Sequence, residues 1–118
     1  GKCYVGTDMG FNVMMRHVLY DSYHEIEVLS GKKAENGIKE ATIVGNICES
    51  GDILASDRKI GPVSEGDIIA VKNAGAYGYS MASNYNCRLR PAEVLISEDG
   101  SVRLIRKADT FESLMANF

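Results

Sequence analysis

Cysteine is scarce in this chain of 118 residues, and the few cysteines form no familiar pattern. The three cysteines stand at positions 3, 48 and 87, with no Cys-x-x-Cys pair and no histidine at the spacing of a zinc site. This odd number argues against a disulfide framework and against a metal site, and it suits a reducing cytoplasm. We expect Cys3 and Cys87 to be small buried residues.

Long apolar runs and a strong charge of one sign are also missing. No run approaches the length of a membrane span or of a secretory signal, so we expect a soluble protein with no membrane partner. The net charge is −3, and the 13 lysines and arginines are scattered. This distribution lacks the basic stripe of a nucleic-acid-binding protein. A length of 118 residues with 45% hydrophobic content is typical of one globular domain with one core.

Short apolar runs separated by turn residues predict a mostly β structure. Within residues 23–29, His24, Ile26 and Val28 alternate with glutamates, which is typical of a half-exposed strand. Asp99-Gly100 lies between two apolar runs and predicts a β-hairpin. The strands that we expect lie at residues 2–5, 23–29, 41–47, 68–72, 94–96 and 102–105.

Two short helices complete the predicted inventory. The first places Phe11, Met14, Met15 and Val18 at helical spacing, with Asn12 available as its cap. The second is a terminal helix with an apolar stripe of Phe111, Leu114, Met115 and Phe118, which we expect to dock on another surface. Asp109 and Glu112 form its predicted capping box. Without a repeated βαβ unit, the pattern predicts an all-β sandwich or barrel.

Two further features punctuate the strands. Gly61-Pro62 and Glu65–Asp67 are turn signals, and the polar residues 30–36 predict a surface loop.

One stretch, Cys48–Asp52, carries more polar chemistry than a simple connector needs. It follows the apolar run 43–47 and offers a thiol, two carboxylates and a hydroxyl at the end of a strand. Loops held by rigid strands often carry binding and catalytic groups. The alternative is a polar turn between two strands, with Cys48 as a small buried residue.

A second stretch, residues 73–86, is rich in glycine, alanine, serine, asparagine and tyrosine. Small residues allow a backbone to approach a ligand closely, and tyrosines offer flat faces and hydroxyl donors. The stretch therefore predicts a site for an aromatic ligand with a polar edge. The alternative is a glycine-rich bend whose tyrosines pack in the core.

Together these motifs resemble the C-terminal domain of the diaminopimelate decarboxylases, which are pyridoxal-phosphate enzymes related to alanine racemase and ornithine decarboxylase. The motifs that carry the resemblance occur in the family's order, at residues 8–12, 16–20, 48–58, 73–86 and 90–94, with Tyr23-His24 between them. His17 departs from the family pattern, which usually has proline there, and this bears on where the local helix starts. The resemblance implies a Greek-key β-barrel or sandwich.

The resemblance also implies roles for five residues. Arg16 is suited to a substrate carboxylate because its guanidinium can bind both oxygens, and Tyr20 adds a hydroxyl donor. Glu49 is suited to the distal ammonium of the substrate. Tyr77 is expected to contact the cofactor phosphate and the substrate. Cys48 is expected to protonate the α-carbon after carbon dioxide leaves, because a thiol can give and recover a proton near neutral pH.

Pyridoxal phosphate is the cofactor that this resemblance implies, since it accepts the electrons left by decarboxylation. No lysine of the chain lies in a motif that resembles the family's Schiff-base lysine, which belongs to an N-terminal α/β barrel. We therefore expect residues 1–118 to form the single C-terminal β domain of a larger two-domain enzyme. Its expected partners are that barrel, an amino-acid substrate and a second subunit, because the Cys48 loop enters the opposite subunit's active site in related decarboxylases.

Three alternatives remain at the level of sequence. The first is a decarboxylase of the same fold that acts on ornithine, arginine or carboxynorspermidine, against which Glu49–Gly51 argues. The second is a catalytically dead relative that only binds partners, against which Cys48, Glu49 and Tyr77 argue. The third is a stand-alone β-barrel interaction module.

Overall fold

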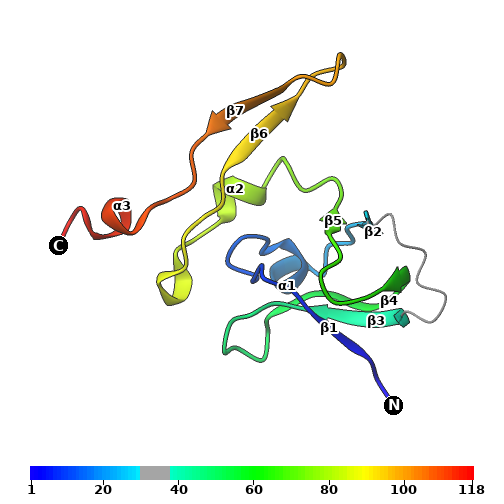
Figure 1. The fold of residues 1–118 in the computed structure, drawn as a ribbon. Coiled ribbons are helices and arrows are strands. Elements are labelled where there is room, and N and C mark those ends of the chain that lie inside the picture. The colour runs from blue at the N-terminus through cyan, green and yellow to red at the C-terminus, as the bar shows by residue number, and fades with distance from the viewer. Residues whose placement is uncertain (30–37) are drawn as a thin grey trace.

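The chain forms short strands with three short helices beside them (Figure 1), in a computed structural model that describes residues 1–29 and 38–118. The elements are β1 (Tyr4–Gly6), α1 (Arg16–Tyr20), β2 (Ile26–Val28), β3 (Ile38–Val44), β4 (Ile53–Val63), β5 (Ile69–Val71), α2 (Gly78–Met81), a 3-10 turn (Tyr85–Cys87), β6 (Glu93–Ile96), β7 (Val102–Arg106) and α3 (Phe111–Met115). Within the described ranges no helix is long and apolar enough to cross a membrane. The predicted loop 30–36 lies outside these ranges.

The body of the domain is built on the sheet β1-β3-β4. β1 runs parallel to β3 and β4 runs antiparallel to it, so Ile43 in the middle strand faces Val5 on one side and Ala55 on the other. Ile43 is 1% exposed. β-branched residues such as this one favour strands and lose little rotamer freedom there. The buried apolar cluster comprises Met14, Ala41, Ile43, Leu54, Ala55, Ile60 and Val63.

A second sheet, β2-β5, packs against this cluster with Ile26 opposite Val71. The predicted alternation is confirmed, because His24 is buried, Ile26 is half-buried and Glu27 is exposed. Glu27 forms an ion pair with Lys72 at 2.6 Å. His24 Nδ1 lies 3.1 Å from the carbonyl oxygen of Lys72, so this histidine hydrogen-bonds beside the strand.

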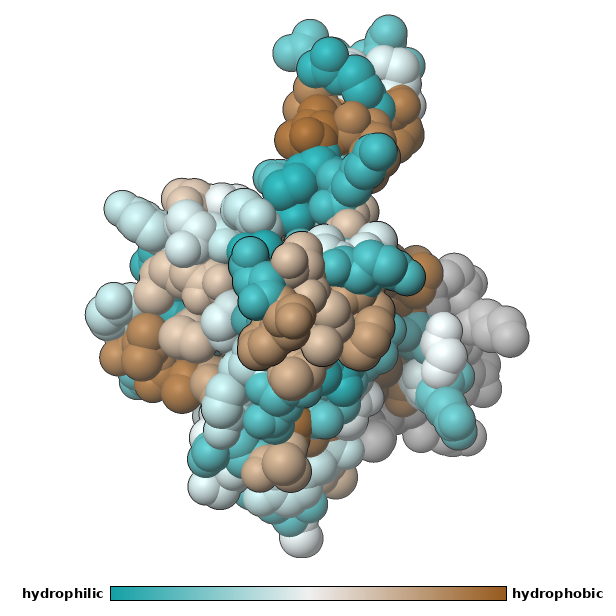
Figure 2. All heavy atoms as spheres, turned by 90° about the vertical axis from the view of Figure 1, so that its left-hand side faces the viewer, coloured by the Kyte–Doolittle hydropathy of each residue, from teal (hydrophilic) through white to brown (hydrophobic). Residues whose placement is uncertain are grey.

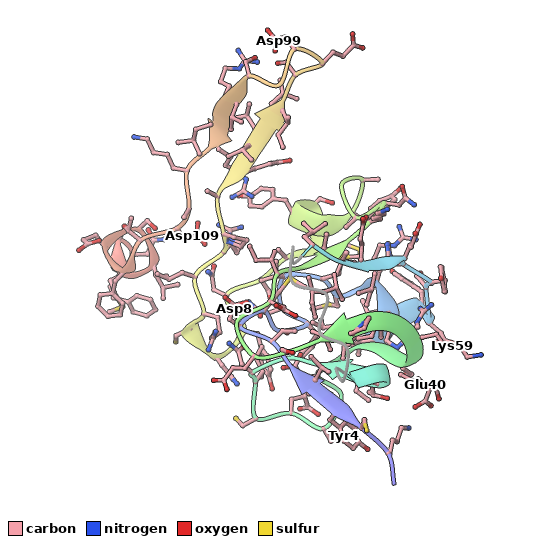
Figure 3. The ribbon with its side chains drawn as sticks, turned by 45° about the vertical axis from the view of Figure 1, so that its right-hand side comes forward. Tyr4, Asp8, Glu40, Lys59, Asp99 and Asp109 are labelled. Atoms are coloured by element: carbon pink, nitrogen blue, oxygen red, sulfur yellow. The ribbon has the colours of Figure 1, made fainter. Side chains whose placement is uncertain are left out.

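The predicted hairpin is confirmed as β6-β7, which extends away from the body with Asp99 at its far end (Figure 3). Gly100 has a φ of +81°, which a glycine adopts without strain, and Ser97 N donates to Ser101 O at 2.9 Å to close the turn. Hydrophobic side chains lie in the middle of the projecting part, between hydrophilic ones at its tip and at its base (Figure 2). The apolar residues exposed there are Val94, Leu95, Ile96, Val102, Leu104 and Ile105.

The terminal helix α3 was predicted to dock, but its apolar stripe is open in this chain. Phe111 is 64% exposed and Phe118 is 98% exposed, and Met115 is exposed as well. Within the described residues, the docking partner of this stripe is therefore not seen.

The mostly-β class is confirmed, and one helix more is found than the two predicted. The described strands form three separate sheets, of three, two and two strands, and none of them closes on itself. Closure into a Greek-key barrel is thus not seen in residues 1–29 and 38–118.

Two predicted boundaries near α1 and in β4 were wrong. Helix α1 begins at Arg16 with Met15 as its cap, and Asn12 does not cap it. Asn12 is instead 1% exposed and donates from Nδ2 to Ser83 O at 3.1 Å, which uses the side chain for a distant segment. Pro62 does not end a strand either, because β4 continues through it to Val63. The register shifts between β3 and β4 show that this pair is irregular, and irregular pairing tolerates proline.

Two other predictions were also wrong. The capping box of α3 is formed by Thr110 and Ser113, with Ser113 N donating to Thr110 Oγ1 at 3.1 Å and Thr110 N donating to Ser113 Oγ at 2.9 Å. Cys3 and Cys87 are exposed in this chain. Cys3 precedes the edge strand β1, and Cys87 lies on the 3-10 turn with a positive φ, so neither backbone position leads into the core.

Asp109, the residue predicted to cap, joins the hairpin and α3 to the segment before β6 (Figure 3). Arg90 donates to its carboxylate from Nε at 2.7 Å and from Nη2 at 3.2 Å, and Asn84 adds a third donor at 3.0 Å. Arg90 and Arg106 both lie over the ring of Tyr79, at 5.0 and 3.5 Å from its centroid. Arg90 and Asn84 hold the pKa of Asp109 well below its ordinary value, because their donors stabilise the charged carboxylate.

Asp109→Asn is expected to lower the melting temperature of the protein, because the variant loses the charged partner of Arg90. Since the pKa of Asp109 is lowered in the folded state, its charge stabilises the fold fully above about pH 4, and this contribution is lost as the pH falls below that. The difference in Tm between wild type and variant, followed by circular dichroism, should therefore shrink in acid. A difference that does not change with pH would show that the charge of Asp109 adds no stability.

Candidate functional site

The loop between β3 and β4, residues 45–52, carries the first predicted motif. Gly45 N donates to Asp52 O at 2.9 Å and closes the loop where the two strands end. The carboxylate of Asp52, which is 4% exposed, accepts from Phe11 N at 2.6 Å and from Ile47 N at 2.7 Å. Asp52 is therefore a buried acceptor that holds the loop, and the residues between it and Ile47 are presented outward.

Cys48 and Glu49 are both exposed on this loop. Glu49 Oε1 accepts from Gly51 N at 3.3 Å and from Ser50 Oγ at 3.4 Å, so the carboxylate curls over its own loop. Asn86, on the 3-10 turn, donates from Nδ2 to the sulfur of Cys48 at 3.6 Å. The thiol and the carboxylate are thus both reachable from solvent.

Arg16 begins α1, and its guanidinium lies over the ring of Tyr77, with Cζ 5.1 Å from the ring centroid. This contact is a cation-π interaction, in which the positive group is attracted to the electron-rich face of the ring. Arg16 Nη2 also donates to Ser22 Oγ at 3.4 Å, at the end of the same turn. Two residues predicted from separate motifs to face the ligand are therefore brought together.

The rest of α1 divides between the surface and the body. Tyr20 is 64% exposed at the end of the helix. His17 turns toward β4, where its Nε2 lies 3.3 Å from Ser56 Oγ. Asp21 ends the helix in the left-handed conformation with φ +50°, which aspartate tolerates better than most residues. His17 therefore lies within α1 and contacts β4.

Tyr77 stands in open surroundings just before α2. It is 54% exposed, and a Cβ built on either Gly75 or Gly78 would meet nothing within 4 Å. The backbone on both sides of Tyr77 can therefore be approached closely by a ligand. A hollow of about 340 Å³ includes Gly75, Gly78 and Tyr79 in its wall.

A second hollow, of about 740 Å³, lies elsewhere, between residues 4–9 and 63–69. Its wall includes neither the loop 45–52 nor α1. Volume therefore does not mark the candidate site, and side-chain chemistry has to locate it.

Four of the five predicted residues form two pairs, Arg16 with Tyr77 and Cys48 with Glu49, and Tyr20 belongs to neither. The loop and α1 approach one another at Gly51, where a Cβ would lie 3.8 Å from Val18 Cγ1. Within the described residues no hydrogen bond, ion pair or ring contact joins one pair to the other. One chain therefore displays two partial sets of ligand-binding groups.

Sequence reasoning missed two residues of the site. Asn86 was predicted only as part of the ligand-binding stretch 73–86, and no contact with Cys48 was foreseen. Its φ of +56° is a left-handed backbone conformation that asparagine tolerates better than most residues. Asp52 was grouped with the exposed polar residues of its motif, although it is buried. Its position directly before a buried strand was the one available signal, since a polar group there needs internal partners.

Comparisons with known proteins identify the family of this chain. The family described as "Pyridoxal-dependent decarboxylase, C-terminal sheet domain" matches residues 1–75. The chain is 49% identical over 116 residues to a diaminopimelate decarboxylase of Neisseria meningitidis serogroup B. The aligned segment covers 98% of this chain and 27% of the relative. It is 44% identical over 112 residues to the diaminopimelate decarboxylase of Methanothermobacter thermautotrophicus. This aligned segment covers 95% of this chain and 26% of the relative. The chain thus spans about a quarter of the length of these relatives.

A solved structure shows the same likeness in three dimensions. The crystal structure of diaminopimelate decarboxylase from M. jannaschii in complex with L-lysine aligns with a TM-score of 0.85 at 43% identity, over 96% of this chain and 25% of that one. Since the family match covers more than half of the 118 residues, the chain belongs to the C-terminal sheet domain family of the pyridoxal-dependent decarboxylases.

Proposed function

We propose that the chain is the C-terminal sheet domain of a diaminopimelate decarboxylase, which converts meso-2,6-diaminopimelate to L-lysine and carbon dioxide. The observation that carries the proposal is the contact between Arg16 and Tyr77 on a chain that also exposes Cys48 and Glu49. The relatives' names support it, as does the L-lysine in the M. jannaschii structure.

In this proposal the chain binds both ends of the substrate. Arg16 binds a carboxylate through two parallel hydrogen bonds, which orient the group as well as hold it. Tyr20, exposed at the end of α1, donates its hydroxyl to the same group. Glu49 pairs with the distal ammonium and turns outward from its own loop to do so. Discrimination then depends on this charge, because an amino acid without the distal ammonium leaves Glu49 unpaired.

Pyridoxal phosphate fits the surroundings of Tyr77. The open space beside Gly75 and Gly78 lets a phosphate approach the backbone, and the Tyr77 hydroxyl supplies a donor. When bound, the cofactor takes up the electron pair left on the α-carbon as carbon dioxide departs. The lysine that would hold it belongs, in this proposal, to an N-terminal barrel domain of the same protein.

Cys48 supplies the proton that completes the reaction. Its sulfur is exposed and accepts a hydrogen bond from Asn86 Nδ2 at 3.6 Å. A thiol can donate a proton near neutral pH and take one back from water, as a general acid must. Cys48 Sγ therefore delivers a proton to the α-carbon of the substrate.

The active protein would be a homodimer of two-domain subunits, with its sites at the subunit interface. The two separate pairs on one chain suit this assembly, because each site can combine groups from two subunits. Strands from elsewhere in the protein would complete the open sheets into a Greek-key barrel. Three exposed free cysteines suit a reducing compartment, and we place the protein in the cytoplasm.

A substrate panel tests the proposal on the whole protein supplied with pyridoxal phosphate. Carbon dioxide release is measured with diaminopimelate, lysine, ornithine, arginine and carboxynorspermidine. Diaminopimelate should exceed each of the others in kcat/KM by roughly 10- to 100-fold, because each of the others has only one carboxylate, and losing the charged hydrogen bond to the second costs about 1.5–3 kcal/mol. A preference for another amine would assign the protein to a related decarboxylase, and absence of turnover would favour a binding role.

A further inference from the structure

Asp52 is the one carboxylate of the Cys48–Asp52 motif that the proposed chemistry does not use. It is 4% exposed, and a buried carboxylate is costly unless hydrogen bonds compensate for lost water. Asp52 meets this requirement with two backbone donors, Phe11 N at 2.6 Å and Ile47 N at 2.7 Å. One donor belongs to its own loop and the other to the segment that leads into α1. The carboxylate therefore connects two parts of the chain that lie far apart in sequence.

Gly45 makes this connection possible. A Cβ built on Gly45 would overlap the carboxyl group of Asp52, so any side chain there would displace it. Gly45 N also donates to Asp52 O at 2.9 Å, and the backbone and the side chain of Asp52 are thus both fixed at this point. The base of the loop depends on a close approach that only glycine allows.

The segment that Asp52 holds is itself fastened to the third motif. Asn12 O accepts from Ser83 N at 2.9 Å, and Asn12 Nδ2 donates to Ser83 O at 3.1 Å. The ring of Phe11 meets that of Tyr85 edge to face, with centroids 5.6 Å apart. Phe11 and Asn12 therefore touch both the Cys48 loop, through Asp52, and the segment that follows Tyr77.

We propose that Asp52 is a positioning residue, which sets the place of Cys48 and Glu49 relative to Arg16 and Tyr77 by way of Phe11. Asp52 then fixes the loop 45–52 on its own chain, whether the loop contributes to the active site of its own subunit or to that of the partner. The kinetic part of this proposal rests on the proposed function. The structural part does not, because it concerns two backbone amides of this chain.

The first test compares Asp52→Asn with Asp67→Asn in the whole protein. Asp67 is the matched control, since its carboxylate accepts from Ser64 N at 2.8 Å in a turn apart from the loop 45–52 and α1. The Asp52→Asn side chain would keep the shape but offer only one acceptor oxygen, and kcat/KM for diaminopimelate should fall roughly 10- to 100-fold, as expected when catalytic groups are misplaced. The Asp67 variant should stay within about twofold of wild type. Binding of pyridoxal phosphate, followed by absorbance, should be unchanged in both.

Amide hydrogen exchange, measured by mass spectrometry, gives a readout that does not depend on turnover. Asp52→Asn should speed exchange in peptides that contain Phe11 and Ile47, while a peptide around Ser64 keeps its rate. Asp67→Asn should do the reverse. Unchanged exchange at Phe11 and Ile47 would overturn the proposal. Faster exchange with kcat/KM equal to that of the Asp67 variant would reduce Asp52 to a structural residue.

Gly45→Ala supplies a second route to the same displacement. Alone it should lower kcat/KM and speed exchange as Asp52→Asn does. Combined with Asp52→Ala, Gly45→Ala should add little to the loss of kcat/KM or to the rate of exchange, because the carboxyl group that the new methyl would overlap is absent. Such non-additivity reveals direct coupling between the two residues. Fully additive effects would overturn the proposal. If wild type does not act on diaminopimelate, the proposed function fails, and exchange in the single and double variants still decides whether Asp52 holds the loop.

Discussion

Glu49→Gln in the whole protein is expected to lower kcat/KM for diaminopimelate by roughly 10- to 100-fold, because the charged hydrogen bond to the distal ammonium is worth about 1.5–3 kcal/mol. The variant should keep the shape of the loop. Glu49 Oε1 accepts from Gly51 N at 3.3 Å and from Ser50 Oγ at 3.4 Å, and the amide oxygen of glutamine can accept the same two bonds. The expected loss therefore reports the charge and not the fold.

Two controls separate this effect from a general one. Glu98→Gln removes an exposed glutamate from the turn of the β6-β7 hairpin, away from the loop 45–52, and should leave kcat/KM unchanged. Pyridoxal phosphate should bind equally to both variants, since the proposed function puts Tyr77, and not Glu49, at its phosphate. Lysine, which keeps the distal ammonium and lacks the distal carboxylate, shows which end of the substrate is affected. An unaltered kcat/KM in the Glu49 variant would remove this residue from substrate binding.

Local features with a strong backbone preference were predictable from sequence. Asp99-Gly100 specified the hairpin because a positive φ is easily reached at glycine, and Gly100 adopts +81°. The alternation from His24 to Val28 specified a half-buried strand because successive side chains point to opposite faces. Both signals lie within a few residues of the structure they determine. Neither depends on distant parts of the chain.

Features that depend on distant partners were mispredicted. The neighbours of Asn12 made it a plausible cap, but its side-chain amide donates to Ser83 O instead. Asp109 was also a plausible cap, but its carboxylate accepts a hydrogen bond from Arg90. Thr110, one position later, took the capping role instead. In each case a polar side chain had two possible uses, and the tertiary contact decided between them.

The site shows the same division. The motifs located Arg16, Cys48 and Tyr77 along the chain, yet the contact between Arg16 and Tyr77 appears only when the segments pack. The hydrogen bond from Asn86 to the Cys48 sulfur was likewise unforeseen. The motifs thus named the candidate residues of a site, and the fold determined which of them meet.

Cys48→Ala is expected to abolish most activity of the proposed homodimer, because general acid catalysis contributes about 10²- to 10⁴-fold to rate. Folding should be little affected, since Cys48 is exposed and the hydrogen bond that it accepts from Asn86 is long at 3.6 Å. Far-UV circular dichroism and cofactor absorbance of the variant should therefore match those of wild type. Full activity would make Cys48 a surface residue without a catalytic role.

Mixing two inactive proteins then tests whether Cys48 acts across the subunit interface. The Cys48→Ala protein is combined with one that lacks the cofactor lysine, and subunits are allowed to exchange. In a mixed dimer one site receives both defects, and the other receives an intact lysine and an intact thiol. Random exchange at equal amounts makes half of the dimers mixed, each with one good site of two, so activity should recover to about a quarter of wild type. Failure to recover, with exchange confirmed by mass spectrometry, would mean that Cys48 serves its own subunit's site.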